Sequence, residues 1–338
     1  MCESSSAMIQ ATGDADPWNR YWDYGNLHSF SQVTPGQYGG VIATFWDQQF
    51  QRLRAGDRVV DIATGNGAIA LMALEAAQRM GRSVQIHGTD RAAIDPAHSL
   101  ADPTLRERAS AIRFHGHTPA EALPFEAASI NLACSQFGLE YSDLERSIPE
   151  LARVLAAGGH AALMLHHADS AAVEAAGREA RQLDFVLDDV RLYAHARLFL
   201  HALTEVDPAT RGRRKKLPAK AAKKRQALDR SIERIQAAAA QAEDDRLLLG
   251  PLNYVHEVLA MTERVGPSQA LDWLEEARRR VSAMRARLAA MQAAALDEPA
   301  MTRCARALEQ AGFATPAIEV VCEAQERILG WSVVAQRP

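Results

Sequence analysis

The sequence predicts an α/β protein built on a mostly parallel sheet, and two observations carry this prediction. Short buried-type strand segments alternate with helical segments between residues 58 and 165. Such alternation requires crossover connections and gives a parallel sheet that helices cover on both faces. In addition, the glycine-rich stretch ATGNGA at 63–68 directly follows the first strand, as in α/β folds that bind nucleotides.

Each element of the sheet region follows from local pattern. We expect strands at 58–62, 83–89, 112–115, 129–134 and 160–165. We expect helices at 35–53, 68–80 and 143–155, with the last stopped at Gly158–Gly159. After residue 300 the pattern predicts a helix at 301–311 and a C-terminal hairpin of strands 317–327 and 331–336, which a turn at Leu329–Gly330 separates.

Between the fifth strand and that last helix the strand pattern disappears. Residues 169–297 show only helical periodicity, with 170–206 read as one long helix or a broken pair and 267–295 as one long helix. Leu274, Val281 and Leu288 recur every seven residues, which suits a helical hairpin, a homodimer contact or packing inside the segment. We therefore expect three regions: an N-terminal tail and aromatic lid segment at 1–34, a core at 35–168 and 298–338, and a helical insertion or cap at 169–297.

Composition favours a cytosolic globular protein. The 338 residues are 48% hydrophobic and 24% charged, and the net charge of −4 gives no overall attraction to nucleic acid or membrane. The four cysteines are scattered without metal-ligand spacing, so we expect reduced thiols and no metal. We find neither a signal-peptide pattern nor an apolar run long enough to span a membrane.

One segment departs from this acidic balance. Residues 211–225 (RGRRKKLPAKAAKKR) hold nine basic residues and no acidic one. The segment is either a contact for RNA or another polyanion, or a solvated loop. We favour the loop, because no aromatic residues are interleaved with the charges.

The glycine loop itself predicts the kind of ligand. Gly65 and Gly67 allow a sharp turn and close approach of a ligand, and the helix that begins at about Ala68 presents unpaired N–H groups. A nicotinamide dinucleotide would place its pyrophosphate there, but Asp61 at the strand end sets a negative charge beside it. Asp61 suits a cationic ligand instead, such as a sulfonium amino acid with a free ammonium group. Asp90, which ends the second strand, can accept hydrogen bonds from both ribose hydroxyls.

Four motifs in order, VVDIATGNG, GTD, AEALPF and LAAGG, resemble those of class I S-adenosylmethionine-dependent methyltransferases. The resemblance is to the ubiquinone- and biotin-biosynthesis-like group (methyltransferase types 11 and 25) and covers roughly residues 35–168 and 300–338. It implies a Rossmann-like fold with a seven-stranded sheet, S-adenosyl-L-methionine as the cofactor, and methyl transfer.

The same resemblance implies roles for single residues. The cofactor-binding set is Asp61, Ala63, Thr64, Gly65, Gly67, Asp90, Arg91, Thr118, Pro119, Ala120, Ser135 and Gln136. The family usually has glycine where Ala63 stands and aspartate where Pro119 stands. Because Pro119 offers neither a carboxylate nor an N–H, either His117, Thr118 or Glu121 substitutes at the adenine, or packing holds it.

Methyl transfer requires alignment of nucleophile and methyl group and exclusion of water, and an oxygen nucleophile of high pKa also needs a base. The catalytic candidates follow strands four and five: His166, His167, Glu140 and Tyr141. Either histidine is a base or a hydrogen-bonded residue at a strand end, and Glu140 is a site residue or a solvated carboxylate. The acceptor-binding candidates are Phe137 and an aromatic N-terminal segment, read as a lid or as a packed cap, with Trp18, Tyr21, Trp22, Tyr24 and His28.

The sequence thus predicts a methyltransferase that modifies an O or N atom of a small organic acceptor enclosed by a helical cap. One alternative is a methyltransferase that acts on RNA or protein through residues 211–225. Another is a cofactor-binding scaffold or partner subunit without catalysis.

Overall fold

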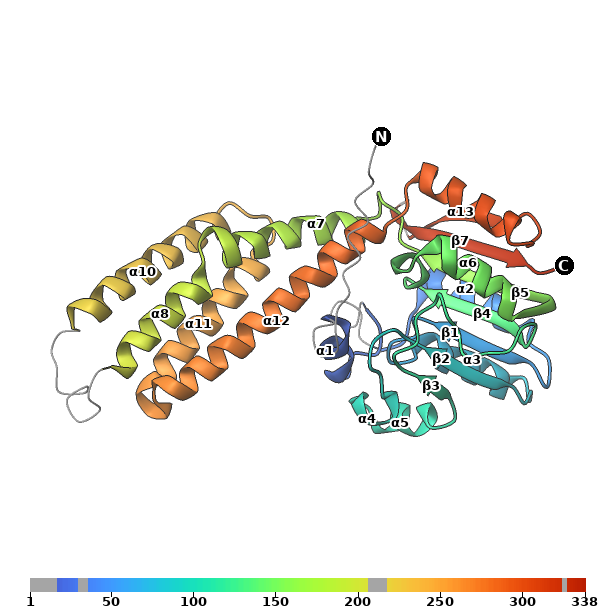
Figure 1. Ribbon diagram of the computed structural model, residues 1–338, viewed down its shortest axis with the longest axis horizontal. Coiled ribbons are helices and arrows are strands. Elements are labelled where there is room, and N and C mark those ends of the chain that lie inside the picture. Colours follow the sequence, from blue (N-terminus) through green and yellow to red (C-terminus); the bar gives the residue numbers. More distant parts are fainter. Residues whose placement is uncertain (1–16, 30–35, 206–217, 324–326) are drawn as a thin grey trace. The chain divides into compact units, whose positions relative to one another are not determined.

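The computed structural model describes residues 17–29, 36–205, 218–323 and 327–338, which fall into two compact units (Figure 1). Unit 1 comprises the described residues of 1–174 and 290–338, and unit 2 comprises those of 175–289.

A seven-stranded sheet forms the centre of unit 1, with strand order β3-β2-β1-β4-β5-β7-β6. Strands β1 (Arg58–Ile62), β2 (Gln85–Thr89), β3 (Arg113–His115), β4 (Ile130–Gln136) and β5 (Leu155–Leu165) are parallel. Strand β7 (Ile328–Gln336) runs antiparallel to β5, and β6 (Ala317–Cys322) antiparallel to β7. The predicted α/β class, its seven strands and its C-terminal hairpin are confirmed.

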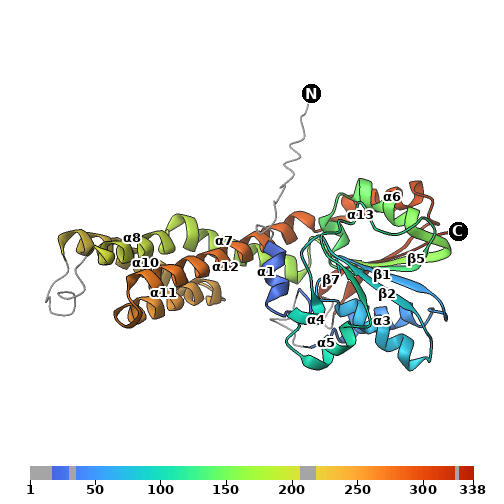
Figure 2. The ribbon, with the colours of Figure 1, turned by 60° about the horizontal axis from the view of Figure 1, so that its bottom comes forward.

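Helices cover both faces of this sheet (Figure 2). On one face α2 (Gly40–Phe50) and α3 (Ala68–Arg79) pack on Val59, Leu132 and their neighbours. On the other, α6 (Leu144–Val154) and α13 (Glu298–Gln310) pack on Val60, Ala133 and theirs. Because successive strand residues point to opposite faces, each strand contributes side chains to the hydrophobic cores on both faces of the sheet. The short helices α1 (Pro17–Asp23), α4 (Pro96–Ser99) and α5 (Pro103–Ala109) complete the unit.

The secondary structure of unit 2 consists of helices, with no strand among its described residues. It comprises most of α7 (Ala171–Asp184), a π-helical turn η3 (Phe185–Asp189), α8 (Leu192–Thr204), α10 (Ala219–Ala239), α11 (Arg246–Val265) and most of α12 (Pro267–Ala294). Its core includes Leu200, Leu228, Val255 and Leu274. Residues 170–205 therefore form the broken pair of helices, and the break lies at Val190–Arg191, where Arg191 has a left-handed φ of +53°. The boundaries 169 and 297 of the predicted insertion stay a prediction.

Four local predictions were wrong. The strand expected at 317–327 ends at Cys322. The helix expected at 35–53 begins only at Gly40. Strand β5 begins at Leu155, directly after α6, rather than beyond Gly158–Gly159. Gly330 lies inside β7 rather than in a turn. The residue is glycine because a Cβ there would come 2.6 Å from the Leu165 carbonyl oxygen, so it allows the strands to pack closely.

Within the described part of the chain, no helix has both the length and the apolar character needed to cross a membrane. The same residues contain no group of three or more His, Cys, Asp or Glu side chains that could hold a metal ion. Cys134 and Cys304 are buried and Cys322 is exposed, all three as free thiols, and Cys2 lies outside the described residues.

Candidate active site

A cleft lies beyond the carboxyl ends of β1, β2 and β4 in unit 1 and encloses about 900 Å³ of empty space, part of it open to solvent. Such a position is where open α/β sheets bind their ligands. Nine of the predicted cofactor residues line it: Asp61, Ala63, Thr64, Asp90, Arg91, Thr118, Pro119, Ala120 and Gln136. Gly65, Gly67 and Ser135 are not among the lining residues.

The two loop glycines are required by backbone conformation and by packing. Gly65 and Gly67 have φ of +53° and +83°, in the left-handed region that favours glycine. A Cβ on Gly67 would come 2.7 Å from the Phe114 ring, and a Cβ on Gly65 would overlap the Trp22 ring. Ser135 is also structural, since its hydroxyl donates to the Ile62 carbonyl oxygen at 2.9 Å and so links β4 to β1. These three residues shape the loop rather than face the cleft.

Asp61 is a buried carboxyl group at the end of β1. Its Oδ2 accepts hydrogen bonds from Thr64 Oγ1 at 2.5 Å and from the Ala70 N–H at 3.2 Å. Burial raises its pKa to about 7; these two hydrogen bonds oppose the rise, and the nearby charge of Asp90 adds to it. A cation in the cleft would therefore favour the ionised form of Asp61.

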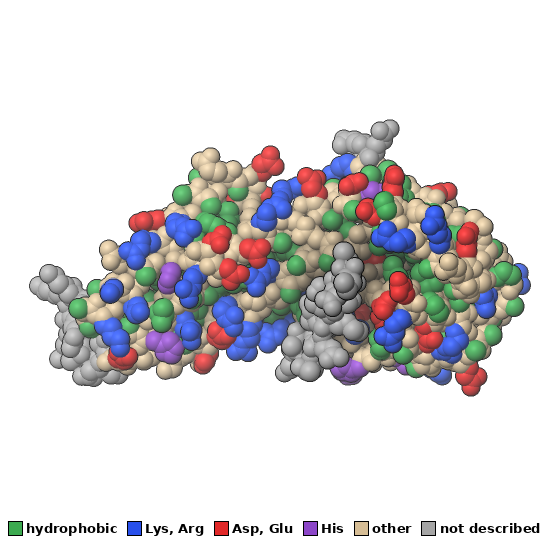
Figure 3. All heavy atoms as spheres, turned by 45° about the horizontal axis from the view of Figure 1, so that its top comes forward, with side chains coloured by type: hydrophobic (Ala, Val, Ile, Leu, Met, Phe, Trp, Pro, Cys, Tyr) green, Lys and Arg blue, Asp and Glu red, His purple; other side chains and the backbone are tan. Residues whose placement is uncertain are grey.

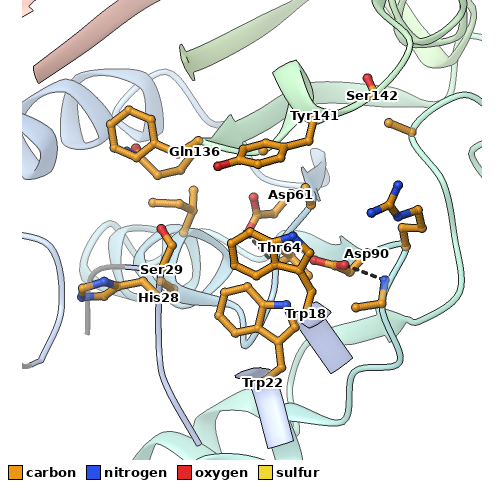
Figure 4. A pocket seen from close by; sticks show the side chains of 18 of the residues that line it. Trp18, Trp22, His28, Ser29, Asp61, Thr64, Asp90, Gln136, Tyr141 and Ser142 are labelled. Atoms are coloured by element: carbon orange, nitrogen blue, oxygen red, sulfur yellow. Dashed lines mark hydrogen bonds between the residues drawn. The ribbon is translucent and has the colours of Figure 1, made fainter. Parts of the chain in front are cut away.

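Asp90 connects the end of β2 to the glycine loop. Its Oδ2 accepts from the Gly65 N–H and its Oδ1 from the Ala92 N–H, both at 2.8 Å. The carboxylate thus fixes the loop while its side chain lines the cleft, as Figure 4 shows. Its predicted contact with ribose hydroxyls stays a prediction.

Residues after β3 form the opposite wall. The Thr118 N–H donates to the Asp90 carbonyl oxygen at 2.8 Å, and the next three residues, Pro119, Ala120 and Glu121, also line the cleft. Glu121 Oε1 already accepts from the Asp143 N–H at 2.8 Å. Of the three substitutes considered for the family aspartate, Thr118 and Glu121 line the cleft, and His117 does not.

Aromatic side chains from α1 and η2 (Leu139–Tyr141) form a further wall (Figure 4). The rings of Trp18 and Trp22 stack at 5.7 Å between centroids, and Tyr141 meets Trp18 edge-on at 5.9 Å. Of the predicted acceptor-binding residues, Trp18, Trp22, His28 and Phe137 line the cleft. Tyr21 is buried behind it, with its hydroxyl donating to the carbonyl oxygens of His28 and Ser29, and Tyr24 is 53% exposed.

Of the four catalytic candidates, only Tyr141 lines the cleft. His166 is buried and stacks on Phe137 at 4.4 Å, and burial lowers its pKa to about 3. His167 stacks on Trp331 at 4.4 Å, and its Nδ1 accepts from the Asp169 N–H. Glu140 Oε1 accepts from the His166 N–H at 2.9 Å, and burial raises the pKa of Glu140 to about 7. The base role of the two histidines stays a prediction, and neither histidine reaches the cleft in this structure.

Sequence reasoning missed several lining residues: Ser29, Tyr38, Ala68, Ile69, Ala92, Gly138 and Ser142. Ala68 and Ile69 could have been found, because the first turn of a helix after a glycine loop faces the bound ligand. Tyr38 carries no such signal, since its position depends on stacking with His28 at 4.2 Å.

The basic segment is only partly described, since 211–217 lie outside the described residues. In the remainder, Lys220 pairs with Glu205 at 2.6 Å and Arg225 with Asp229 at 2.7 Å. On the face that Figure 3 shows, Lys and Arg side chains of the helical unit are interspersed with Asp and Glu. These ion pairs fit a solvated surface.

The strand order, the antiparallel β7 and the acidic glycine-loop cleft together define the class I methyltransferase fold. Residues 60–163, less than half of the chain, match the family model described as "Methyltransferase domain", and the predicted S-adenosylmethionine-dependent methyltransferase with S-adenosyl-L-methionine as methyl donor is confirmed for this segment.

Among curated proteins, the chain is similar to the demethylmenaquinone methyltransferase of Thermus thermophilus. The two are 35% identical over 107 residues, which is 31% of this chain and 46% of that protein. The chain therefore spans less than half the length of this relative.

Solved structures with similar folds include the YcgJ protein of Bacillus subtilis, at 24% identity over 43% of this chain and 59% of that one, with a TM-score of 0.29. Another is the geranyl diphosphate C-methyltransferase of Streptomyces coelicolor A3(2), at 18% identity over 44% and 62% of the two chains, with a TM-score of 0.31.

Proposed function

We propose that this protein transfers the methyl group of S-adenosylmethionine to an O or N atom of a small organic acceptor. The observation that carries the proposal is the charge of the cleft. Asp61 and Asp90 are buried at its centre, and among the described lining residues Arg91 is the only permanently cationic side chain. A cofactor with a sulfonium and an ammonium group supplies the positive charge that two buried carboxyl groups require.

The residues present fit this cofactor in chemistry, because carboxyl groups for its cationic end and aromatic side chains line one cleft. When bound, the cofactor supplies a methyl group already activated by its sulfonium. The protein's part is to bind the amino-acid end beside Asp61, hold the ribose at Asp90, and exclude water with aromatic side chains.

The aromatic lining of the cleft indicates the kind of acceptor. Trp18, Phe137 and Tyr141 all line the cleft, which favours an acceptor with an apolar, ring-sized body. Burial raises the pKa of the Tyr141 hydroxyl, so this group donates a hydrogen bond rather than accepts a proton at neutral pH. The proposal that residues 169–297 cap the acceptor is separate from the cofactor proposal.

Calorimetry with S-adenosylhomocysteine tests the cofactor proposal. We expect wild-type protein to bind it, and Asp61→Asn and Asp90→Asn to bind about tenfold or more weakly, as the loss of hydrogen bonds to charged groups implies. Asp23→Asn, at an exposed carboxylate, is the matched control and should bind normally. Absence of binding to wild-type protein would refute the proposal.

Transfer of a labelled methyl group from S-adenosylmethionine to a set of phenols, carboxylic acids and amines then tests catalysis. Cofactor binding without transfer to any of them, or to RNA and protein, would favour the scaffold alternative. Deletion of 211–225 should leave transfer to a small acceptor unchanged. Loss of methyl transfer in the deletion variant would instead favour the RNA or protein alternative.

A further inference from the structure

The side chain of Gln136 has a fixed orientation at the floor of the cleft. Gln136 is the last residue of β4, it lines the cleft, and it is only 8% exposed. Its Oε1 accepts a hydrogen bond from Trp46 Nε1 at 2.5 Å. An indole N–H can only donate, so the amide oxygen must face Trp46 and the amide nitrogen must face elsewhere.

Trp46 itself has no freedom to turn. It is fully buried in α2, stacks on Phe50 at 5.7 Å and meets Phe45 edge-on at 5.0 Å. The Nε2 of Gln136 is consequently held in place, is buried, and has no hydrogen-bond acceptor among the described residues. A buried donor without an acceptor costs free energy, which a ligand oxygen at this position would recover.

The neighbours of Gln136 indicate which oxygen this is. Asp61 pairs with Cys134 across β1 and β4, so Gln136 lies two residues further along β4, on the same face of the sheet as Asp61. Asp61 attracts an ammonium group, whereas Gln136 can only donate. An α-amino acid carries its ammonium and its carboxylate on the same carbon, so one such group can satisfy both side chains.

The charges around the cleft agree with this arrangement. Ala68 and Ile69, in the first turn of α3, also line the cleft, and the N-terminus of a helix favours a negative charge. Arg91, the cation among the described lining residues, follows β2, which flanks β1 on the side away from β4. Arg91 is therefore placed for the nucleoside end rather than for the amino-acid end.

We propose that Gln136 Nε2 donates a hydrogen bond to the carboxylate of the cofactor's amino-acid end, and that Trp46 is the positioning residue that orients the amide. This assignment rests on the proposed function. It makes Gln136 a determinant of affinity for the aminoacyl part of the ligand and leaves adenosine recognition to other residues.

Two ligands separate these parts. S-Adenosylhomocysteine carries the amino-acid end, and 5′-methylthioadenosine has the same nucleoside and sulfur without it. We expect Gln136→Met to weaken S-adenosylhomocysteine about ten- to hundredfold in calorimetry and to leave 5′-methylthioadenosine within about twofold. Gln136→Glu keeps the shape and an oxygen for Trp46 but sets a carboxylate against a carboxylate, so it should weaken S-adenosylhomocysteine at least as much. Trp46→Phe, which removes the orienting donor and keeps an aromatic ring at the site, should give a smaller loss for the same ligand alone.

Gln49→Met is the matched control. Gln49 is an equally buried glutamine of α2 with an unbonded Oε1, but it does not line the cleft, and its replacement should change neither affinity. Retained 5′-methylthioadenosine binding shows that a variant is folded. Equal weakening of both ligands, or normal S-adenosylhomocysteine binding by Gln136→Met, overturns the assignment while wild-type binding still supports the cofactor. If wild-type protein binds neither ligand, the proposed function itself fails.

Discussion

The side chain of Asn66, in the middle of the glycine loop, holds helix α1 by its backbone: Asn66 Nδ2 donates to the Trp22 carbonyl oxygen at 2.9 Å. The same nitrogen donates to the Asn26 carbonyl oxygen at 2.8 Å, and Asn66 Oδ1 accepts from Ser99 Oγ at 2.9 Å. Asn66 is fully buried and uses its amide in three hydrogen bonds. The aromatic segment is thus attached to the loop that the cofactor is proposed to contact.

We therefore expect Asn66→Ala to release α1. Loss of these bonds should destabilise the segment by about 1–3 kcal/mol and speed tryptic cleavage after Arg20. Mass spectrometry of the digest measures the rate of this cleavage. Ser99→Ala removes only the third bond and should have an intermediate effect. Cleavage of Asn66→Ala at the wild-type rate would show that α1 is held by its aromatic packing instead.

The titration of Asp61 predicts a pH dependence of ligand binding. Its pKa is about 7 in the folded protein against an ordinary value of 3.8, so folding favours the protonated form. A ligand with an ammonium group beside Asp61 favours the ionised form, which is about one tenth populated one pH unit below the pKa. Affinity for S-adenosylhomocysteine should therefore rise about tenfold between pH 6 and pH 8.

The same shift has the opposite sign for the stability of the ligand-free protein. The folded state binds the Asp61 proton more tightly than the unfolded state, so this stabilisation is complete below about pH 4 and is lost as pH rises through 7. Asp61→Asn should flatten the pH dependence of affinity and reduce the fall in the free energy of unfolding as pH rises. Part of that fall should persist, because Glu140 has a similarly raised pKa. An unchanged affinity profile in Asp61→Asn would assign the titration to another group.

Local pattern predicted most of the sheet and the position of the cleft, because strand hydrophobicity and the glycine loop are properties of neighbouring residues. It placed Asp61 and Asp90 at adjacent strand ends, and the structure has both in one cleft. It did not predict that Thr64 of the loop donates a hydrogen bond to the Asp61 carboxyl group and Gly65 donates one to that of Asp90. Such bonds depend on how the turn closes, which side-chain type alone does not specify.

Long-range relationships were out of reach for a related reason. Trp46 and Gln136 are 90 residues apart, and only the packing of α2 on the sheet brings the indole to the amide. Gly330 was read as a turn because glycine is common in turns; the contact with Leu165 that requires it exists only once β5 and β7 pair. His166 was chosen as a base by its strand-end position, which does not indicate on which side of Phe137 its ring lies.

Gly330→Ala tests the packing explanation. A Cβ at this position would come 2.6 Å from the Leu165 carbonyl oxygen and 3.0 Å from the Phe137 ring. The two strands must separate to admit it, so we expect a loss of about 2–4 kcal/mol in the free energy of unfolding, measured in urea. Gly250→Ala, in α11 where nothing lies within 4 Å of the added carbon, should be neutral or slightly stabilising. Wild-type stability of Gly330→Ala would mean that the hairpin adjusts freely.

Replacement of the two histidines after β5 decides whether either acts as a base. Because burial lowers the pKa of His166 to about 3, its ring is neutral and a poor proton acceptor at neutral pH. We expect His166→Leu, which roughly keeps the volume against Phe137, to lose less than about 2 kcal/mol of stability and to keep S-adenosylhomocysteine affinity. Turnover with any acceptor identified should stay within about tenfold of wild type, below the usual effect of removing a general base.

His167→Leu serves as the paired variant, since His167 also lies outside the lining of the cleft. A loss of more than about a hundredfold in turnover at unchanged cofactor affinity, in either variant, would instead assign the base to that histidine and require the cleft to open toward it.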